Sequence, residues 1–316
     1  MMLNKNNWVR LGLWMLFVGG AASVNGQKPA EREKLNAFNY QKGIVYKTVN
    51  GKSLDLVFFE PKNVKPGEKT PWMLFVHGGG WRGGNEYNIL KTAFLGTLQQ
   101  LTENGIACVS LEYRLTRGGV TAYDSVVDCK DAARFLLKNA AKYNLDPERY
   151  GVWGGSAGGH LSLMTALGLD KDFKGDEALA EIPLSFKCVA SYYPLTTLLN
   201  PDVLEGSKFE DPEVLRHVLN GLFSEKPELA RLLSPTEYLS KETPPILLLH
   251  GDADPILDIK NSIYMMEVAK ATGANVELLT VKQARHSFGG KNISPSMDEI
   301  NEISARFIRS HFESNH

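Results

Sequence analysis

Short apolar or β-rich runs recur along the chain, and such runs are typical of strands buried on both faces of a largely parallel sheet. Turn-forming residues or segments with helical spacing separate them. The pattern predicts strands at 72–76, 106–113, 149–153, 187–193, 245–249 and 275–281.

The segments between these runs carry the spacing of helices. One apolar helix face is predicted at Val126, Cys129, Ala133, Leu136 and Ala140, which lie three or four residues apart. Lys130, Arg134 and Lys138 are expected on the opposite, polar side of that helix.

Two more helices are expected. The first covers 86–103. The second begins near Ser294 and Pro295, because Asp298 and Glu299 suit the first turn of a helix.

A β-hairpin precedes the alternating part of the chain. Asn50 and Gly51 lie between the β-rich segments 43–49 and 53–59, and Asn-Gly is the strongest short hairpin signal. A hairpin followed by alternating strands and helices predicts an α/β fold, with a mostly parallel eight-stranded sheet and helices on both faces. The segment 194–242 breaks this alternation with loops and short helical pieces, so it is expected to be an insertion near the strand ends.

The N-terminal segment reads as an export signal. Lys5 and Arg10 precede the apolar segment 11–18, and small residues follow as far as Gly26. This is the layout of a secretory signal peptide, whereas a membrane anchor would need about 20 apolar residues. We therefore expect a signal peptide at 1–26, a polar lead-in at 27–42, a catalytic domain at 43–316, and a secreted or periplasmic product without a stable membrane span.

Composition narrows the classes of partner and cofactor. A length of 316 residues allows one α/β domain, and a net charge of -1 gives no reason to expect nucleic acid as a partner. The three cysteines, Cys108, Cys129 and Cys188, are too few and too far apart for a metal cluster. Buried thiols are favoured over a single disulfide, and no metal or cofactor is expected.

The segment from Gly154 to His160 carries the clearest chemical signal. It places Ser156 at the centre of Gly-x-Ser-x-Gly between a predicted strand and an apolar, helix-forming segment. A serine on such a strained turn needs nearly side-chain-free neighbours, which Gly154 and Gly158 provide. The strand–turn–helix context predicts a nucleophile elbow.

A second glycine-rich loop follows the strand at 72–76. Gly78, Gly79 and Gly80 leave backbone N–H groups uncovered at the carboxyl end of a central strand, just before Trp81. Such groups can stabilise a developing oxyanion. The alternative is a flexible loop without a chemical role.

A nucleophilic serine needs a base and an orienting acid. We choose His286 as the base, because it is the histidine in a loop after the last predicted strand. His160, in the helix after the elbow, is expected to pack or to brace the glycine loop. Asp254 is favoured as the acid over Asp252, which is better placed to hold its own turn, and Asp258 is a distant third.

Taken together, these segments resemble α/β-hydrolases of the esterase and lipase superfamily. The closest branch is the hormone-sensitive-lipase-like and feruloyl- and acetyl-xylan-esterase-like one. The resemblance rests on His77–Trp81, Glu112–Leu115, Asp146–Pro147, Gly154–His160, Ser234–Pro235 with Tyr238, His250–Pro255 and His286–Phe288.

The resemblance implies a triad of Ser156, Asp254 and His286. It also implies an oxyanion hole from the N–H groups of Ala157 and of Gly79 or Gly80, with Trp81 as a variant. Residues that flank these loops could line the substrate site or simply pack in the core. They are Trp81, Tyr87, Tyr193, Leu195 and Phe288.

These features predict an exported serine carboxylesterase that acts on a small-molecule or oligosaccharide ester, with acetyl or feruloyl groups on carbohydrate as the expected substrates. One alternative is an exported amide hydrolase of the peptidase or aryl-formamidase type with the same triad. Another is a non-catalytic binding protein on a hydrolase fold.

Overall fold

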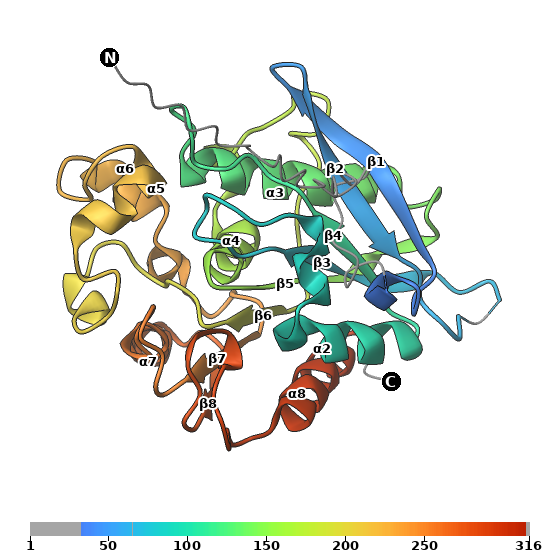
Figure 1. Ribbon diagram of the computed structural model, residues 1–316. Helices are drawn as coiled ribbons and strands as arrows, with labels where there is room; N and C mark the ends of the chain where they lie inside the picture. The colour runs from blue at the N-terminus through green and yellow to red at the C-terminus, as the bar shows by residue number, and fades with distance from the viewer. Residues whose placement is uncertain (1–32, 65, 314–316) are drawn as a thin grey trace, which may run out of the picture.

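The computed structural model describes residues 33–64 and 66–313, so the expected signal peptide lies outside the described residues. Eight strands form one sheet in the order β1-β2-β4-β3-β5-β6-β7-β8 (Figure 1). They are β1 (Tyr40–Val49), β2 (Lys52–Phe59), β3 (Thr70–Val76), β4 (Ala107–Leu111), β5 (Leu145–Gly155), β6 (Val189–Tyr192), β7 (Ile246–Gly251) and β8 (Val276–Val281). Strand β2 is antiparallel to β1 and β4, and the pairs from β4 to β8 are parallel. The prediction of a mostly parallel eight-stranded sheet is confirmed.

The hairpin closes at the predicted turn. Asn50 and Gly51 have φ of 51° and 76°, and Val49 pairs with Lys52. Two positive φ values in succession are what a two-residue hairpin turn of type I′ requires, and Asn-Gly accommodates them with little strain.

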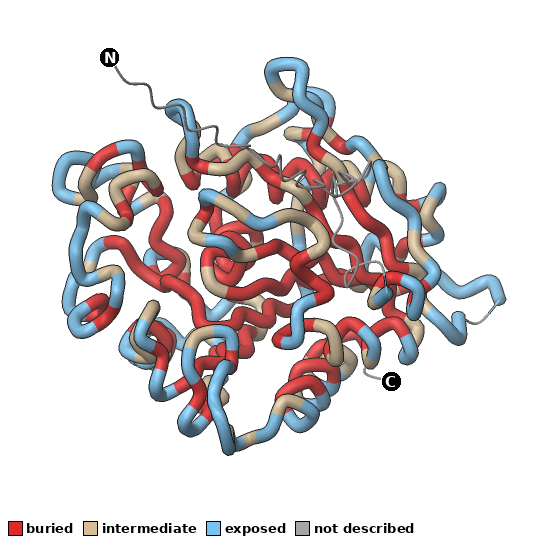
Figure 2. The backbone as a smooth tube through the Cα atoms, in the orientation of Figure 1, coloured by how far each residue is buried: buried red, intermediate tan, exposed pale blue. Residues whose placement is uncertain are grey.

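Helices cover both faces of the sheet. Helices α2 (Thr92–Glu103) and α8 (Met297–Ser310) lie side by side on one face (Figure 1). Helices α3 (Ala122–Lys138), α4 (Ala157–Leu167) and α7 (Lys260–Thr272) pack on the other. The central strands are buried along their length, and exposed backbone gathers at the rim (Figure 2).

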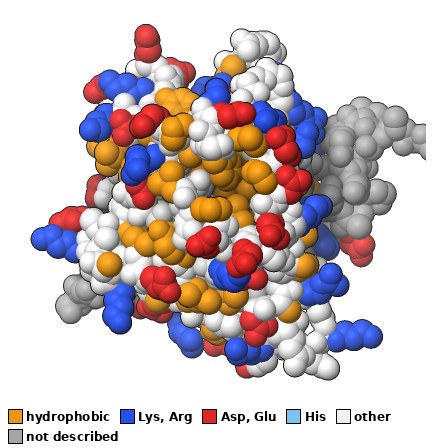
Figure 3. All heavy atoms as spheres, turned by 90° about the vertical axis from the view of Figure 1, so that its left-hand side faces the viewer, with side chains coloured by type: hydrophobic (Ala, Val, Ile, Leu, Met, Phe, Trp, Pro, Cys, Tyr) orange, Lys and Arg blue, Asp and Glu red, His pale blue; other side chains and the backbone are white. Residues whose placement is uncertain are grey.

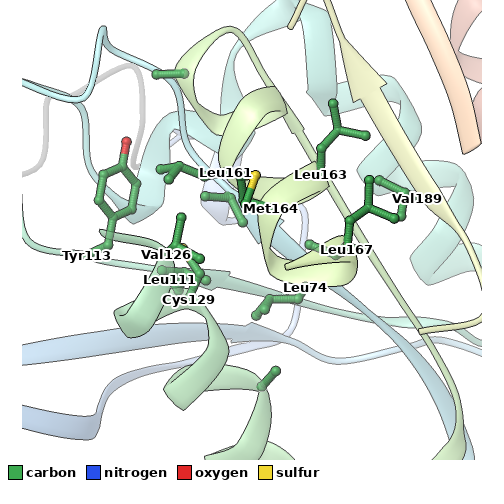
Figure 4. Close-up of a cluster of buried hydrophobic side chains, with 14 of the residues drawn as sticks. Leu74, Leu111, Tyr113, Val126, Cys129, Leu161, Leu163, Met164, Leu167 and Val189 are labelled. Carbon is green, nitrogen blue, oxygen red and sulfur yellow. The ribbon is translucent and has the colours of Figure 1, made fainter. Parts of the chain in front are cut away.

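Each face has its own apolar cluster. Leucines of α4 meet Val126 and Cys129 of α3 over Leu74 and Leu111 of the sheet (Figure 4). On the opposite face, aromatic and aliphatic side chains of α2 and α8 pack against β3, β5 and β6. The two clusters pack both faces of the sheet, and the loops that follow β3, β5, β7 and β8 leave from its carboxyl edge.

Two helix boundaries differ from the expectation. The segment 86–103 is split at Lys91, whose extended backbone (ψ 153°) separates a short 3-10 helix at Glu86–Leu90 from α2. Helix α8 begins at Met297, because Ser296 and Glu299 form a capping box two residues later than the predicted start.

The end of the polar lead-in packs against the domain. Leu35 and Phe38 are buried, and the Phe38 ring packs edge-on against Phe59 with centroids 5.4 Å apart. Strand β1 already begins at Tyr40. Apolar contacts of Leu35 and Phe38, together with the hydrogen bond from Lys34 Nζ to the Leu90 carbonyl at 2.9 Å, attach this segment to the domain.

The polar side predicted for α3 is wrong at two positions. Lys130 and Arg134 are buried, and both bind Asp170, at 2.9 and 3.1 Å. The Arg134 guanidinium also donates to the carbonyls of Phe173 and Ile182. A loop after α4 therefore covers these charges and supplies their partners.

The insertion contains two short α-helices, α5 (Arg216–Leu219) and α6 (Pro227–Leu232), and three 3-10 helices at Pro201–Leu204, Pro212–Leu215 and Pro235–Tyr238. It projects beside α4 and α7, on the left in Figure 1. None of the described helices is long and apolar enough to cross a membrane. Cys108, Cys129 and Cys188 are buried free thiols.

Candidate active site

Ser156 lies on a sharp turn between β5 and α4. Its backbone is strained, with φ 59° and ψ -124°. A Cβ atom on Gly154 would lie 2.4 Å from the Val76 carbonyl oxygen, and one on Gly158 only 2.1 Å from the same atom. The turn itself therefore favours glycine at these two positions. The close packing of α4 against the end of β3 also leaves no room there for a Cβ atom.

Three segments far apart in the sequence bring Ser156, His286 and Asp254 into one hydrogen-bonded row. The Ser156 hydroxyl lies 3.0 Å from His286 Nε2, and His286 Nδ1 lies 2.7 Å from Asp254 Oδ2. His286 is in a short 3-10 turn (His286–Phe288) after β8, and Asp254 follows β7. This geometry allows the imidazole to accept the serine proton while the carboxylate holds the ring.

Asp254 is held in place from several sides. Its Oδ1 atom accepts hydrogen bonds from the N–H groups of Ile256 (2.8 Å) and Leu257 (3.2 Å). Burial alone raises the pKa of Asp254, but the neighbouring His250 and His286 rings and the Ile256 N–H lower it more, so that this pKa lies well below its usual range. The carboxylate is therefore ionised at neutral pH, as an acceptor for His286 must be.

The rival acid and the rival histidine of this region have other partners. Asp252 accepts from the Gln283 N–H at 2.7 Å and so braces the turn after β8. His250 is fully buried between the Ser262 hydroxyl and the Leu257 carbonyl, each at 2.8 Å, and its Nε2 lies 3.6 Å from Asp254. Neither the Asp252 nor the His250 side chain forms a hydrogen bond with Ser156.

The glycine loop lies against the elbow. A Cβ atom on Gly78 would come within 2.6 Å of the Gly155 carbonyl oxygen, and one on Gly79 within 2.2 Å of the Gly83 carbonyl oxygen. In the described chain, the N–H groups of Gly79 and Gly80 have no hydrogen-bond acceptor. Ala157, the first residue of α4, presents its N–H at the helix start beside Ser156.

A cavity of about 330 Å³ opens above Ser156. Its wall consists of Gly78–Gly80, Asn88, Lys91, Phe94, Gly155, Ser156, Tyr193, Phe209, Ile256, His286 and Ser287. Of the predicted pocket residues only Tyr193 is on this wall, and its ring meets the His286 ring edge-on at 4.7 Å.

The other predicted pocket residues are not on the cavity wall. Trp81, Leu195 and Phe288 are core residues, and Phe288 packs against the rings of Tyr192 and Tyr193. The Trp81 indole N–H donates to His160 Nδ1 at 3.3 Å. A buried indole needs an acceptor, and His160 supplies it, so Trp81 turns away from the cavity.

His160 links the elbow helix to the insertion. Its Nε2–H donates to the Leu233 carbonyl at 2.8 Å, which leaves Nδ1 to accept from Trp81. Burial lowers the pKa of His160 to about 4, so the ring is neutral at pH 7 and this tautomer is fixed. The residue braces the glycine loop, as its position in the sequence suggested.

A second cavity of about 370 Å³ lies within the insertion and is lined mainly by apolar side chains, including Leu198, Leu204, Phe209 and Phe223. Hydrophobic side chains gather on this face of the molecule (Figure 3). Phe209 lines both cavities and therefore forms a partition between them.

Several wall residues carry no signal in the sequence. Asn88, Lys91 and Phe94 follow the glycine loop, and they reach the site because the chain breaks at Lys91 instead of continuing one helix. Phe209 comes from the irregular insertion. Ile256 could have been found, because it lies two residues after Asp254.

Comparison with known proteins places these features in a family. A model of the BD-FAE family matches residues 56–268. Esterase LipQ of Mycobacterium tuberculosis is 27% identical over 227 residues, which are 72% of this chain and 52% of that protein. Isoprenylcysteine alpha-carbonyl methylesterase ICME of Arabidopsis thaliana is 28% identical over 258 residues, 78% of this chain and 56% of its own length. The chain thus spans about half the length of these relatives.

A solved structure matches over most of both chains. It is a thermophilic esterase, Est2, from the Planctomycetes species Thermogutta terrifontis, with a TM-score of 0.68 and 26% identity. The match covers 86% of this chain and 92% of the esterase. The fold is therefore that of α/β-hydrolase esterases. Within the described residues, no group of three or more His, Cys, Asp or Glu side chains is placed to hold a metal ion.

Proposed function

The chain belongs to the BD-FAE family, and on this premise we propose that it is a serine carboxylesterase that works through an acyl-enzyme on Ser156. The observation that carries the proposal is the Ser156–His286–Asp254 row, with 3.0 and 2.7 Å between its members. The esterases among the relatives and matched structures support the same class of activity.

In the proposed mechanism His286 Nε2 takes the Ser156 proton while Oγ attacks the ester carbonyl carbon. The tetrahedral intermediate then expels the alcohol, which receives its proton from the His286 imidazolium. A water molecule, activated by the same imidazole, attacks the acyl-enzyme and releases the acid. Asp254 stabilises the imidazolium in both halves of the reaction.

The oxyanion is assigned to backbone donors. The free N–H groups of Gly79 and Gly80 and the N–H of Ala157 flank Ser156, and fixed donors stabilise charge without reorganising. The positive end of α4 adds to this field.

We further propose that the substrate is an acyl ester of a carbohydrate, with an acetyl or feruloyl group. The resemblance of the sequence motifs to the feruloyl- and acetyl-xylan-esterase-like branch supports this choice. The cavity is compatible with it, because Asn88 and Lys91 add polar groups to a wall that also holds Phe94 and Tyr193. Export by the predicted N-terminal signal would bring the enzyme to such a substrate.

A panel of substrates tests the proposal. Wild type and Ser156→Ala are compared on p-nitrophenyl acetate, methyl ferulate, acetylated xylan, a dipeptidyl amide and N-formylkynurenine. We expect turnover of esters only, with none in Ser156→Ala. Activity confined to the amides would replace the ester assignment, and activity on aryl esters without release of acetate or ferulate from carbohydrate would reject the carbohydrate substrate. Detection of the mature N-terminus near Gln27 in the exported fraction tests the signal peptide.

A further inference from the structure

We propose that His217 is a positioning residue for the oxyanion loop, which is the segment Gly78–Trp81. His217 holds this loop by donating its Nε2–H to the carbonyl oxygen of Gly80. The two atoms are 2.9 Å apart, and the residues are 137 positions apart in the sequence. The inference rests on the proposed function, because it assigns the insertion a part in the same reaction.

Each carbonyl of the glycine loop has its own donor. The Gly78 oxygen lies 2.9 Å from His77 Nδ1 and 3.4 Å from Asn88 Nδ2. The Gly79 oxygen accepts from the N–H groups of Arg82 and Gly83 at 3.2 and 3.1 Å. These donors belong to the same stretch of chain as the loop, whereas the donor to Gly80 is His217 of the insertion.

Fixing a carbonyl also fixes the next N–H. In a trans peptide the C=O of one residue and the N–H of the next point in opposite directions. Holding the oxygens of Gly78 and Gly79 therefore orients the N–H groups of Gly79 and Gly80. Holding the Gly80 oxygen orients the Trp81 N–H and ties down the end of the loop.

Gly80 depends on such an external contact. Its φ is +61°, and a Cβ built on it would meet no atom within 4 Å. The space on the Cβ side of Gly80 is therefore open, and glycine is the most flexible residue of the backbone. A donor from another element adds a restraint on the residue that carries one of the proposed oxyanion donors, beyond the local bonds that orient its N–H group.

His217 is well anchored for this role. It lies in α5, where Val218 and Leu219 are fully buried, and it follows the equally buried Leu215, while His217 itself is half-buried. A carbonyl oxygen can only accept, so Nε2 carries the proton. Burial lowers the pKa of His217, and the neutral ring still donates through Nε2.

The insertion also holds the neighbouring residue. Trp81 is bonded to His160, which is bonded to Leu233 at the end of α6. Two consecutive residues of the loop are thus tied to two parts of the insertion, α5 and the end of α6. The insertion is therefore a structural support of the oxyanion loop as well as a wall of the cavity.

Three variants test the role of His217. His217→Leu removes the donor at similar bulk, His217→Gln keeps an N–H at similar reach, and Arg216→Gln is the matched control on an exposed position of α5. The measurements are kcat and KM on p-nitrophenyl acetate, the second-order rate of inactivation by a fluorophosphonate, and Tm. We expect His217→Leu to lower kcat about tenfold with KM within twofold, a smaller loss than removal of a direct donor. The glutamine variant should recover most of kcat, and Arg216→Gln should match wild type.

The proposal is overturned if His217→Leu keeps more than half of kcat, if the glutamine variant is as slow as the leucine variant, or if Arg216→Gln loses as much. Should His217→Leu not fold, His217→Asn, whose amide stops short of Gly80, takes its place. A wild type that reacts with the fluorophosphonate but hydrolyses no ester would reject the proposed function alone, and the inactivation rates would then decide the role of His217. A wild type that does neither rejects both.

Discussion

The side chain of Asp254, the acid of the proposed triad, makes more hydrogen bonds than that of Ser156 or His286. Asp254 uses one oxygen for two backbone N–H groups and the other for His286, so its orientation is set before a substrate binds. The same contacts keep its pKa low. A carboxylate in this position selects the His286 tautomer that leaves Nε2 free to accept the serine proton.

Asp254→Asn tests this selection. The amide cannot stabilise an imidazolium and favours the wrong tautomer, so we expect kcat on p-nitrophenyl acetate to fall about 10⁴-fold with little change in fold. Asp252→Asn is the control, because Asp252 lies two residues from Asp254 but binds the Gln283 N–H instead of His286, and this variant should stay within a few-fold of wild type. A loss below tenfold in Asp254→Asn would argue against the triad.

At the scale of elements, the contact between α4 and β3 fixes the conformation of the turn that carries Ser156. Gly158→Ala would place a Cβ 2.1 Å from the Val76 oxygen and 2.6 Å from backbone atoms of His77, and backbone cannot move aside as a flexible side chain can. We expect a loss of about 1–3 kcal/mol or more in the free energy of unfolding, together with loss of activity. Urea denaturation measures the first and ester hydrolysis the second.

Gly83→Ala is the matched control for this prediction. Its nearest neighbour to an added Cβ is 3.8 Å away, and its φ is not positive, so both stability and activity should be retained. Equal stability of the two variants would mean that α4 can shift away from β3.

The insertion should also govern the size of the acyl group. Phe209 separates the catalytic cavity from the apolar cavity of the insertion. We expect Phe209→Ala to join the two and to raise kcat/KM for an octanoyl ester relative to the acetyl ester about tenfold, since the added room accepts several methylene groups.

Phe223→Ala provides the comparison, because Phe223 lines the apolar cavity but not the catalytic one. It should leave the octanoyl-to-acetyl ratio near that of wild type. An unchanged ratio in Phe209→Ala would show that the cavities stay separate without the ring.

For the molecule as a whole, buried ionisable groups predict a stability maximum near pH 6.5. Burial lowers the pKa of His77 and of His160 to about 4 in the folded protein. On acidification below pH 6.5 these two histidines are therefore protonated in the unfolded chain before they are in the folded one, and stability falls. Burial, reinforced by Glu86, raises the pKa of Glu112 to about 8, so the folded state keeps a proton that the unfolded chain releases, and stability also falls as the pH rises toward 8.

Urea unfolding between pH 5 and pH 8 measures both limbs. Below pH 6.5 the unfolded chain binds two more protons at His77 and His160, whereas the folded state binds one more at Glu112. The free energy of unfolding therefore still rises with pH in this range. Glu112→Gln should flatten the alkaline limb and leave a net fall in stability on acidification. A stability that rises steadily to pH 8 would contradict the assignment of Glu112.

The sequence allowed the sheet, the elbow turn and the proximity of Ser156, Asp254 and His286 to be predicted, because each rests on local pattern or on chain order. Ser156, Asp254 and His286 follow strands whose carboxyl ends meet at one edge, so topology alone brings them together. The buried charges of α3 were not predictable, since Asp170 becomes their partner only after a later loop folds over Arg134. For Trp81 the sequence left the pocket wall and the core open for a similar reason, because its acceptor lies 79 residues away.

The reactivity of the three buried thiols can report how the native protein opens. Cys129 lies in the apolar cluster beneath α3 and α4, whereas Cys108 and Cys188 lie in the cluster beneath α2 and α8. Burial raises the pKa of all three, so a thiol reagent can act only on a molecule that has opened.

Mass spectrometry of each labelled cysteine would therefore record the opening of the two helical layers separately. We expect all three to label slowly and in step with global unfolding in urea. Faster labelling of Cys129 alone would reveal that the layer carrying the nucleophile breathes independently of the sheet beneath it.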